Sequence, residues 1–367
     1  MQPPSTPARI CNIDLLRGLV AVSVLIWHYQ HFYYPTAEGL PVDWEPSQQP
    51  WFAWLEWAYS YGGLWRVQWF WLLSGFTFFH IYGQRRDIPV RVFLGQRFAR
   101  LYPLHFATLC IVAALQVASL QWLGHFQIYP DNDAYHFTLH VFFASAWGLQ
   151  TGFSFNYPVW SLSVELLVLG LFLVYLKNVR VTLASSLAWL FAAWVCSRLA
   201  PIDLFLCMVM FTLGGVVQQW NQGFVQRWGP GLNLAAAALA SCIAVAALAS
   251  DRLPMAAVLQ KMLLPALTWL AAALEQGRFS VGRWGTGLGN LSYASYLIHI
   301  PVQLVALLVL DGVVGSRAAV DSGWFLLGFI AVVMGLAWPT YHGFERPLQL
   351  LLRRKLEPRP ASADQAN

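Results

Sequence analysis

Long apolar runs, each about the length of a bilayer-spanning helix, dominate the pattern of hydrophobic and polar positions along the chain. A helix needs roughly 20 mostly apolar residues to cross the hydrocarbon core of a membrane. The sequence contains about ten such runs, separated by polar segments. The pattern therefore predicts an all-α integral membrane protein, a bundle of about ten transmembrane helices. The runs lie near residues 15–33, 64–82, 101–121, 158–176, 181–199, 201–220, 232–250, 254–274, 288–310 and 323–343.

The composition excludes a water-soluble globule. Only 11% of the residues are charged and 58% are hydrophobic, whereas an ordinary soluble domain has roughly 25% charged residues. The net charge of +5 comes from short basic clusters between apolar runs. Such clusters are typical of topology signals, so we expect no nucleic-acid partner. The five cysteines form no CxxC pair, which supports neither a disulfide framework nor a zinc site.

The distribution of lysine and arginine predicts the orientation. With the N-terminus inside, about sixteen basic residues fall in inner segments and about five in outer ones, as the positive-inside rule requires. Both termini are then cytoplasmic, with segments 1–12 and 348–367 flanking one membrane domain at 13–347, and we expect no cleaved signal peptide. The apolar stretch 137–149 is too short to cross. We expect it to be a re-entrant or interfacial part of a long outer segment, 122–157.

Ionisable side chains inside these runs are candidates for function, because charge is costly within a bilayer. Arg17 and His28 are eleven residues apart, so they share one helix face about 16 Å apart. Glu165 is expected about 10 Å below the outer surface, at a depth similar to that of His28, with His28 or Arg17 as its partner. His299 is expected near the midplane. A snorkelling arginine, a structural ion pair and a histidine bonded to a neighbouring helix are the alternatives.

Two arginines, Arg97 and Arg100, are spaced three residues apart and should share a helix face at the inner membrane surface. Guanidinium groups bind phosphate oxygens in a bidentate manner, so this pair suits a phosphate-bearing ligand. The alternative is anchoring to the membrane through lipid headgroups. His136 and His140 lack a third ligand on their helix face, so we expect no metal site.

Two further motifs are weaker. The glycines at 285, 287 and 289 follow no predicted strand, so we interpret them as a loop before the ninth run rather than as a dinucleotide-binding motif. The outer segment 34–63 is rich in tryptophan, and in a helix its tryptophans would form an aromatic stripe. Such a stripe would stack on a sugar or belong to an interfacial belt. Its members are Trp44, Trp51, Trp54 and Trp57.

At these residues the chain resembles the acyltransferase-3 family of integral membrane acyltransferases. Each matching motif is weak alone, but six of them occur in order along nearly the whole chain. They are Asp14-Leu-Leu-Arg17-Gly-Leu with His28, Ser74-Gly-Phe, Arg97-Phe-Ala-Arg100-Leu-Tyr-Pro, Trp160-Ser-Leu-Ser-Val-Glu165, Ser292-Tyr-Ala-Ser-Tyr-Leu-Ile-His299 and Phe344-Glu-Arg-Pro347. The chain stops soon after Pro347, so we expect the stand-alone form without the fused hydrolase-like domain of some members.

The resemblance implies a function. Residues 13–347 would form an acyltransferase-3 transmembrane domain in a bacterial inner membrane, in contact with membrane lipid. The donor substrate would be cytoplasmic acyl-CoA, with acetyl-CoA expected, and no cofactor would be tightly bound. The acceptor would be a hydroxyl of a sugar or cell-envelope polysaccharide, and the product an O-acetylated compound. The resemblance leaves homo-oligomer formation open.

Site residues follow from the same motifs. His28 is expected to act as a general base or to be transiently acylated, with Glu165 orienting it. Arg17, Arg97 and Arg100 would hold the donor. The remaining members of the donor- and substrate-binding set are Asp14, Ser74, Trp160, Ser161 and His299. The alternative is a secondary transporter or polysaccharide exporter, although the sequence shows no internal symmetry between halves. A non-catalytic scaffold would leave the buried ionisable groups without a reason.

Overall fold

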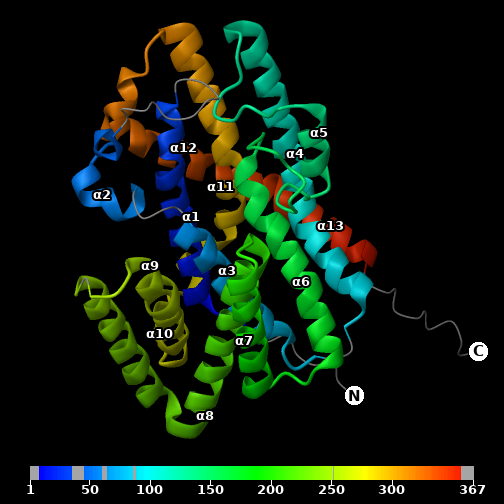
Figure 1. Cartoon of the computed structure of the whole chain (residues 1–367), viewed down its shortest axis with the longest axis vertical. Helices are drawn as coiled ribbons and strands as arrows, with labels where there is room; N and C mark the ends of the chain where they lie inside the picture. The colour runs from blue at the N-terminus through cyan, green and yellow to red at the C-terminus, as the bar shows by residue number, and fades with distance from the viewer. Residues whose placement is uncertain (1–7, 35–44, 60–63, 86–87, 251, 357–367) are drawn as a thin grey trace, which may run out of the picture.

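The computed structural model describes residues 8–34, 45–59, 64–85, 88–250 and 252–356. Within these ranges the regular structure is helical and contains no strand, and Figure 1 shows the helices arranged as one bundle. Seven helical segments are long and apolar enough to cross a membrane: Cys11–Tyr33, Val90–Leu123, Tyr157–Asn178, Asp203–Ala249, Met255–Gln276, Gly282–Val314 and Gly323–Lys355. The prediction of an all-helical, multi-pass membrane protein is thereby confirmed.

The expected number of crossings stays a prediction. Two expected runs correspond to α3 (Leu64–Tyr82) and to the shorter α7 (Leu183–Leu199), which are not among the seven. Two other runs lie within α8 (Asp203–Ala249). Its backbone breaks at Gly229, where φ is 80° and ψ is 167°, directly before Pro230. Glycine tolerates this positive φ and proline cannot continue a helix, so the sequence itself divides α8 into two halves. The side on which the termini lie also stays a prediction.

The helix that carries Arg97 and Arg100 is longer than the expected run. α4 (Val90–Leu123) continues without interruption for 34 residues, with Pro103 inside it. The arginine pair is therefore part of the same helix as the apolar run that follows. The next helix, α5 (Ala134–Val141), has only eight residues and begins after Asp133, whose side chain accepts a hydrogen bond from the backbone N–H of His136. Eight residues span about 12 Å, so α5 is too short to cross, as expected.

The start of α6 (Trp160–Asn178) is buried inside the bundle. A 3₁₀ turn at Tyr157–Val159 precedes it, and both Asn156 and Val159 are 0% exposed. The Asn156 side-chain amide donates a hydrogen bond to the carbonyl of Leu297 at 2.9 Å. The segment before α6 is therefore packed inside the bundle, against α11.

Glycines allow α1 (Cys11–His28) and α11 (Gly282–Val309) to pack closely. A β-carbon added at Gly289 would lie 2.6 Å from both Cβ and the carbonyl oxygen of Asp14. Gly285 faces the Cys11 carbonyl in the same way, and Gly18 faces Leu288. Small residues that let helix backbones approach are a common means of helix association in membranes. The expected loop at 285–289 is therefore wrong: spacing by four residues places Gly285 and Gly289 on one face of a helix.

This packing leads to a prediction with a matched control. Gly289→Ala places a methyl group against the backbone of Asp14, so we expect lower thermal stability in detergent, by the roughly 1–3 kcal/mol typical of overpacking. A β-carbon added at Gly287 would have no atom within 4 Å, so Gly287→Ala should melt like the wild type or slightly higher. Thermal unfolding of both purified variants tests the contact. Equal melting temperatures for the two would contradict it.

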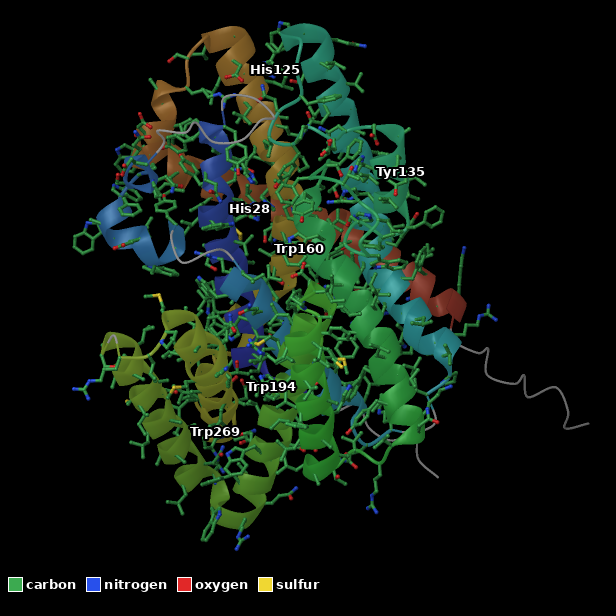
Figure 2. All side chains as sticks on the ribbon, in the orientation of Figure 1. His28, His125, Tyr135, Trp160, Trp194 and Trp269 are labelled. Carbon is green, nitrogen blue, oxygen red and sulfur yellow. The ribbon has the colours of Figure 1, made fainter. Side chains whose placement is uncertain are left out.

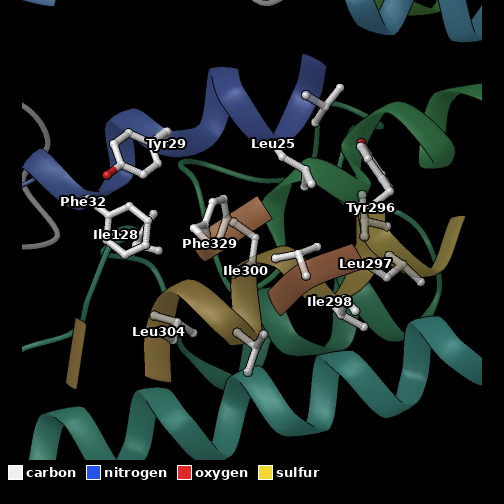
Figure 3. Packing of buried hydrophobic residues seen from close by; sticks show 14 of the residues in the cluster. Leu25, Tyr29, Phe32, Ile128, Tyr296, Leu297, Ile298, Ile300, Leu304 and Phe329 are labelled. Carbon is white, nitrogen blue, oxygen red and sulfur yellow. The ribbon is translucent and has the colours of Figure 1, made fainter. Parts of the chain in front are cut away.

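A hydrophobic cluster fixes the C-terminal half of α1 against α11 and α12 (Gly323–Pro339). Figure 3 shows Tyr29 and Phe32 of the α1 region packed near Ile300 and Leu304 of α11 and Phe329 of α12. The rings of Tyr29 and Phe329 are 6.0 Å apart, and those of Phe32 and Phe329 are 5.4 Å apart. The cluster holds in register the two helices that carry His28 and His299.

Candidate functional site

A partly open cavity of about 160 Å³ lies between α1, α3, α4, α6 and α11. Its polar lining includes six of the residues expected from the sequence: Arg17, Ser74, Arg97, Arg100, Ser161 and Glu165. They come from four helices and are separated in the sequence by up to 148 positions, from residue 17 to residue 165. Aromatic and aliphatic side chains complete the walls, among them Phe70, Trp71, Phe78, Leu162 and Tyr293.

The charges around this cavity are predominantly positive. Three guanidinium groups line it together with one carboxylate, that of Glu165. The Ser74 hydroxyl donates a hydrogen bond to Glu165 Oε1 at 2.5 Å. Arg17 donates to the carbonyl of Leu73 at 3.5 Å, and the Arg97 guanidinium lies 4.8 Å above the ring of Phe78. Three cations against one anion in a partly buried space favour an anionic ligand.

The Arg97 side chain has an unused donor. Its Nε is buried and has no hydrogen-bond partner among the described residues. A buried N–H without a partner costs about 1–3 kcal/mol. The cost disappears when a ligand supplies an acceptor, and phosphate, carboxylate and carbonyl oxygens all do so. The unpaired Nε lies on a residue that lines the cavity, which supports a ligand site there.

Three histidines form a separate cluster beside the cavity. The rings of His28 and His299 are 4.9 Å apart, and those of His28 and His31 are 4.8 Å apart. His31 is 3% exposed and His299 is 0% exposed. The His299 Nδ1–H donates to the carbonyl of Tyr296 at 2.6 Å, while its Nε2 is buried without a partner in the described part of the chain. Figure 2 shows His28 near the middle of the bundle.

The expected contact between His28 and Glu165 is not present, which corrects the sequence-based interpretation. Glu165 lines the cavity with Arg17, whereas His28 does not line it and contacts His31 and His299. Glu165 faces α3 instead, where Ser74 donates a hydrogen bond to its carboxylate. Arg17, the second expected partner, does line the same cavity as Glu165.

Tyr296 separates the cavity from the histidine cluster. Its side chain lines the cavity, and its ring lies 6.0 Å from that of His299. The hydroxyl hydrogen-bonds with Ser161 Oγ at 2.9 Å and donates to the carbonyl of Pro158. Sequence reasoning missed Tyr296, although it lies inside the quoted motif, three residues before His299 on the same helix face. That spacing was the available signal.

Two more expected site residues lie outside the cavity lining. Asp14 forms an ion pair with Arg9 and packs against Gly289. Trp160 packs edge-on against Trp71, with ring centroids 5.8 Å apart at 90°. Their contacts place Asp14 at the α1–α11 contact and Trp160 behind the cavity wall.

The tryptophan-rich outer segment does not form one stripe. Trp44 lies outside the described residues. Trp54 and Trp57 belong to α2 (Phe52–Tyr59), whereas Trp51 precedes the helix with a φ of 52° and lies against Gly323. Trp54 is 82% exposed, as is typical of an interfacial belt.

A second hollow, more open than the first, has a volume of about 640 Å³. Phe32 and Tyr33, which follow His31 directly in the chain, form one wall, and the polar residues Gln48, Asp311, Arg317 and Asp321 form much of the rest. Arg317 makes a bidentate ion pair with Asp311, with both N–O distances 2.6 Å. In the part of the chain that the structure describes, no group of three His, Cys, Asp or Glu side chains could hold a metal ion.

Comparisons with known proteins agree with this picture. A family model described as an acyltransferase domain matches residues 11–342. Acyltransferase MdmB from Streptomyces mycarofaciens is 27% identical over 331 residues, which cover 78% of this chain and 81% of that protein. Protein 2 in the picA locus of Rhizobium radiobacter is 29% identical over 180 residues, which cover 45% of this chain and 81% of that protein. No solved structure matches the chain.

Proposed function

The chain belongs to the acyltransferase-3 family of membrane acyltransferases, and from this premise we propose that it transfers a short acyl group from cytoplasmic acyl-CoA to a hydroxyl of a sugar or cell-envelope polysaccharide. Acetyl-CoA is the first donor to test. The observation that carries the proposal is the juxtaposition of an arginine-lined cavity with a histidine cluster, separated by the side chain of Tyr296. The arginine-lined cavity suits a phosphate-bearing donor, and the histidine cluster suits proton transfer from a hydroxyl.

The cavity fits one end of the donor. Its volume of about 160 Å³ is below the roughly 300–1,000 Å³ of pockets that hold a whole drug-sized ligand. We propose that Arg97 and Arg100 bind phosphate oxygens of coenzyme A, while the acyl end points towards Tyr296. Arg17 lies one helix away on α1 and is placed to stabilise negative charge on the thioester oxygen during transfer.

The proposed reaction is general-base catalysis at His28. The acceptor hydroxyl oxygen attacks the thioester carbonyl carbon, a C–O bond forms and the C–S bond breaks. His28 takes the hydroxyl proton and returns it to the departing thiolate, so that the products are an ester and free coenzyme A. The unpartnered Nε2 of His299, whose ring is 4.9 Å from that of His28, would accept a hydrogen bond from the acceptor and orient it.

Glu165 takes a different part in this proposal from the one expected. Its carboxylate lines the cavity with three arginines and accepts a hydrogen bond from Ser74. In that position it limits the net positive charge of the empty cavity and fixes the arginine side chains by Coulomb attraction. We propose that it organises the donor site rather than the histidine.

The acceptor is proposed to approach from the second hollow. That hollow is polar and four times larger than the cavity, about 640 Å³ against 160 Å³, and its wall residue Phe32 is adjacent to His31 in the chain. Carboxylates and amides such as those of Asp321 and Gln48 are suitable partners for hydroxyl groups. The relative from Streptomyces carries the name acyltransferase, which supports the reaction class.

Release of coenzyme A separates the enzyme from the competing transporter or exporter. We expect the purified protein in detergent to convert acetyl-CoA and a hydroxyl acceptor into free coenzyme A and an acetyl ester. A panel of sugars and oligosaccharides supplies the acceptor, a thiol reagent measures coenzyme A and mass spectrometry identifies the ester. Omitting the acceptor should reduce the release to background. A transporter would release none with any acceptor, and that outcome across several acyl-CoA donors would contradict the proposal.

A further inference from the structure

Three polar side chains beyond the cavity, those of Gln303, His31 and Tyr129, form a chain of hydrogen bonds that ends at His28. Gln303 is 0% exposed, His31 is 3% and Tyr129 is 4%, and Tyr129 belongs to the hydrophobic cluster that contains Tyr29 and Phe32. Burying polar groups among apolar ones is costly unless each finds a partner. We infer that His31 and Gln303 are positioning residues that fix the tautomer of His28, keeping its Nδ1 protonated and its Nε2 basic. The inference deepens the proposed function and rests on it.

The orientation of the Gln303 amide is determined by a backbone group. Its Nε2 donates a hydrogen bond to the carbonyl oxygen of His28 at 2.7 Å. A carbonyl oxygen only accepts, so the nitrogen of the amide must face it. The amide oxygen Oε1 then faces His31 Nδ1 at 3.2 Å. Because an amide oxygen also only accepts, Nδ1 of His31 carries a proton.

The state of His31 determines that of His28. A neutral imidazole has one N–H and one lone pair, so Nε2 of His31 is the acceptor. Two groups approach this lone pair, the Tyr129 hydroxyl at 3.2 Å and His28 Nδ1 at 3.4 Å. Both must donate to it, and because they share one lone pair, neither contact is short. His28 therefore carries its proton on Nδ1, and its second nitrogen, Nε2, has the free lone pair.

This tautomer is the one that a general base requires. With Nδ1 bonded to His31, only Nε2 can receive the proton of an acceptor hydroxyl. When Nε2 has taken that proton, Nδ1–H still donates to His31, so no partner has to rearrange during the reaction. In serine proteases a carboxylate performs the same task, and loss of the correct tautomer lowers kcat about 10⁴-fold. A neutral histidine and an amide give a weaker constraint, so we expect a smaller effect here.

The chain of hydrogen bonds from Gln303 through His31 to His28 also accounts for the spacing of these residues in the sequence. His31 follows His28 by three residues, in the 3₁₀ turn Tyr29–Tyr33 that ends the α1 segment. Gln303 follows His299 by four residues on α11, so its side chain lies one turn beyond that of His299 on the same face. Two helices thus supply one imidazole of the proposed site each and one supporting side chain each.

The test compares two substitutions of His31 in the full-length protein. His31→Leu removes the acceptor, so we expect kcat to fall by at least about tenfold while the KM for acyl-CoA is unchanged, because the donor cavity lies elsewhere. His31→Gln restores an acceptor for His28 Nδ1 and a donor for Gln303, and it should recover most of the loss. Tyr129→Phe removes only the second donor to His31 and serves as the matched control, with a change in kcat below about threefold.

A spectroscopic readout tests the tautomer without relying on activity. The ¹⁵N signals of histidine ring nitrogens distinguish the two tautomers, and the signals of His28 are those absent from His28→Asn. We expect a single form with the proton on Nδ1 in the wild type and a mixture in His31→Leu. A wild-type proton on Nε2, or full kcat in His31→Leu, would overturn the inference. Failure of acyl transfer with every donor would contradict the proposed function instead and would leave the NMR test of the tautomer intact.

Discussion

His28→Ala should lower acyl transfer by about 10²–10⁴-fold, the usual cost of losing a general base, while the protein still folds and inserts. His28 is partly buried between two other imidazoles. Alanine removes the nitrogen that is proposed to take the proton, but it adds no volume and no charge. Turnover of acetyl-CoA by purified protein measures the loss, and thermal unfolding measures the fold. We expect KM for the donor to change little, since His28 does not line the donor cavity.

His125→Ala provides the control for this substitution. His125 lies at the end of the molecule in Figure 2, away from His28, and its ring contacts the carbonyl of Phe126. Its removal should leave transfer within about twofold of the wild type, as for a surface substitution. If His28→Ala keeps more than about a tenth of the activity, His28 is not the base. His299, the neighbouring imidazole, would then be the next candidate.

Much of the fold was predictable because membrane helices obey simple rules. Apolar runs of about 20 residues must be helical in hydrocarbon, since each backbone group needs an internal partner there. The expected positions of these runs all coincide with helices. What the runs do not encode is which connecting segments pack inside the bundle. The stretch before α6 looks like an outer loop in sequence, yet Asn156 bonds to the backbone of Leu297 and is fully buried.

The difference between local sequence pattern and packing also explains which site residues could be predicted from the sequence. Arg17 and Glu165 stand out in sequence because a charge inside an apolar run is rare, Arg97 stands out by its spacing from Arg100, and all three line the cavity. Tyr296, His31 and Gln303 do not stand out, because none of them carries a fixed charge. Their importance comes from contacts between helices that are far apart in the sequence.

Glycines at 285 and 289 show a further limit. In the sequence alone they resemble a flexible loop, and the prediction of a loop was wrong. Their role becomes visible only when α1 lies against them, where a β-carbon would meet the backbone of Cys11 or Asp14. Glycine is suited both to close helix packing and to a flexible chain, and only the presence of a neighbouring helix shows which of the two a given glycine provides.

The donor site leads to the second large expected effect. Changing Arg97 and Arg100 together to alanine should weaken acyl-CoA binding strongly, because each lost charged hydrogen bond costs about 1.5–3 kcal/mol, tenfold or more in affinity. The KM of the acceptor should not move, since neither arginine lies in the histidine cluster. Changing both to lysine should recover only part of the affinity, because an ammonium keeps the charge without the bidentate geometry. Calorimetric titration of coenzyme A into detergent-solubilised protein measures the effect.

Arg91→Ala is the matched control for the arginine pair. Arg91 lies on the same helix, α4, about two turns before Arg97, but it is exposed and does not line the cavity. Its guanidinium is one positive charge, against the two that the double variant loses, so a general electrostatic attraction to the membrane or to coenzyme A would be weakened about half as much by its loss. We expect Arg91→Ala to bind coenzyme A as the wild type does. Equal affinities for the double variant and the wild type would remove the donor phosphates from this cavity. A loss of binding free energy in Arg91→Ala of about half that in the double variant would indicate non-specific attraction, because position inside the cavity would then make no difference.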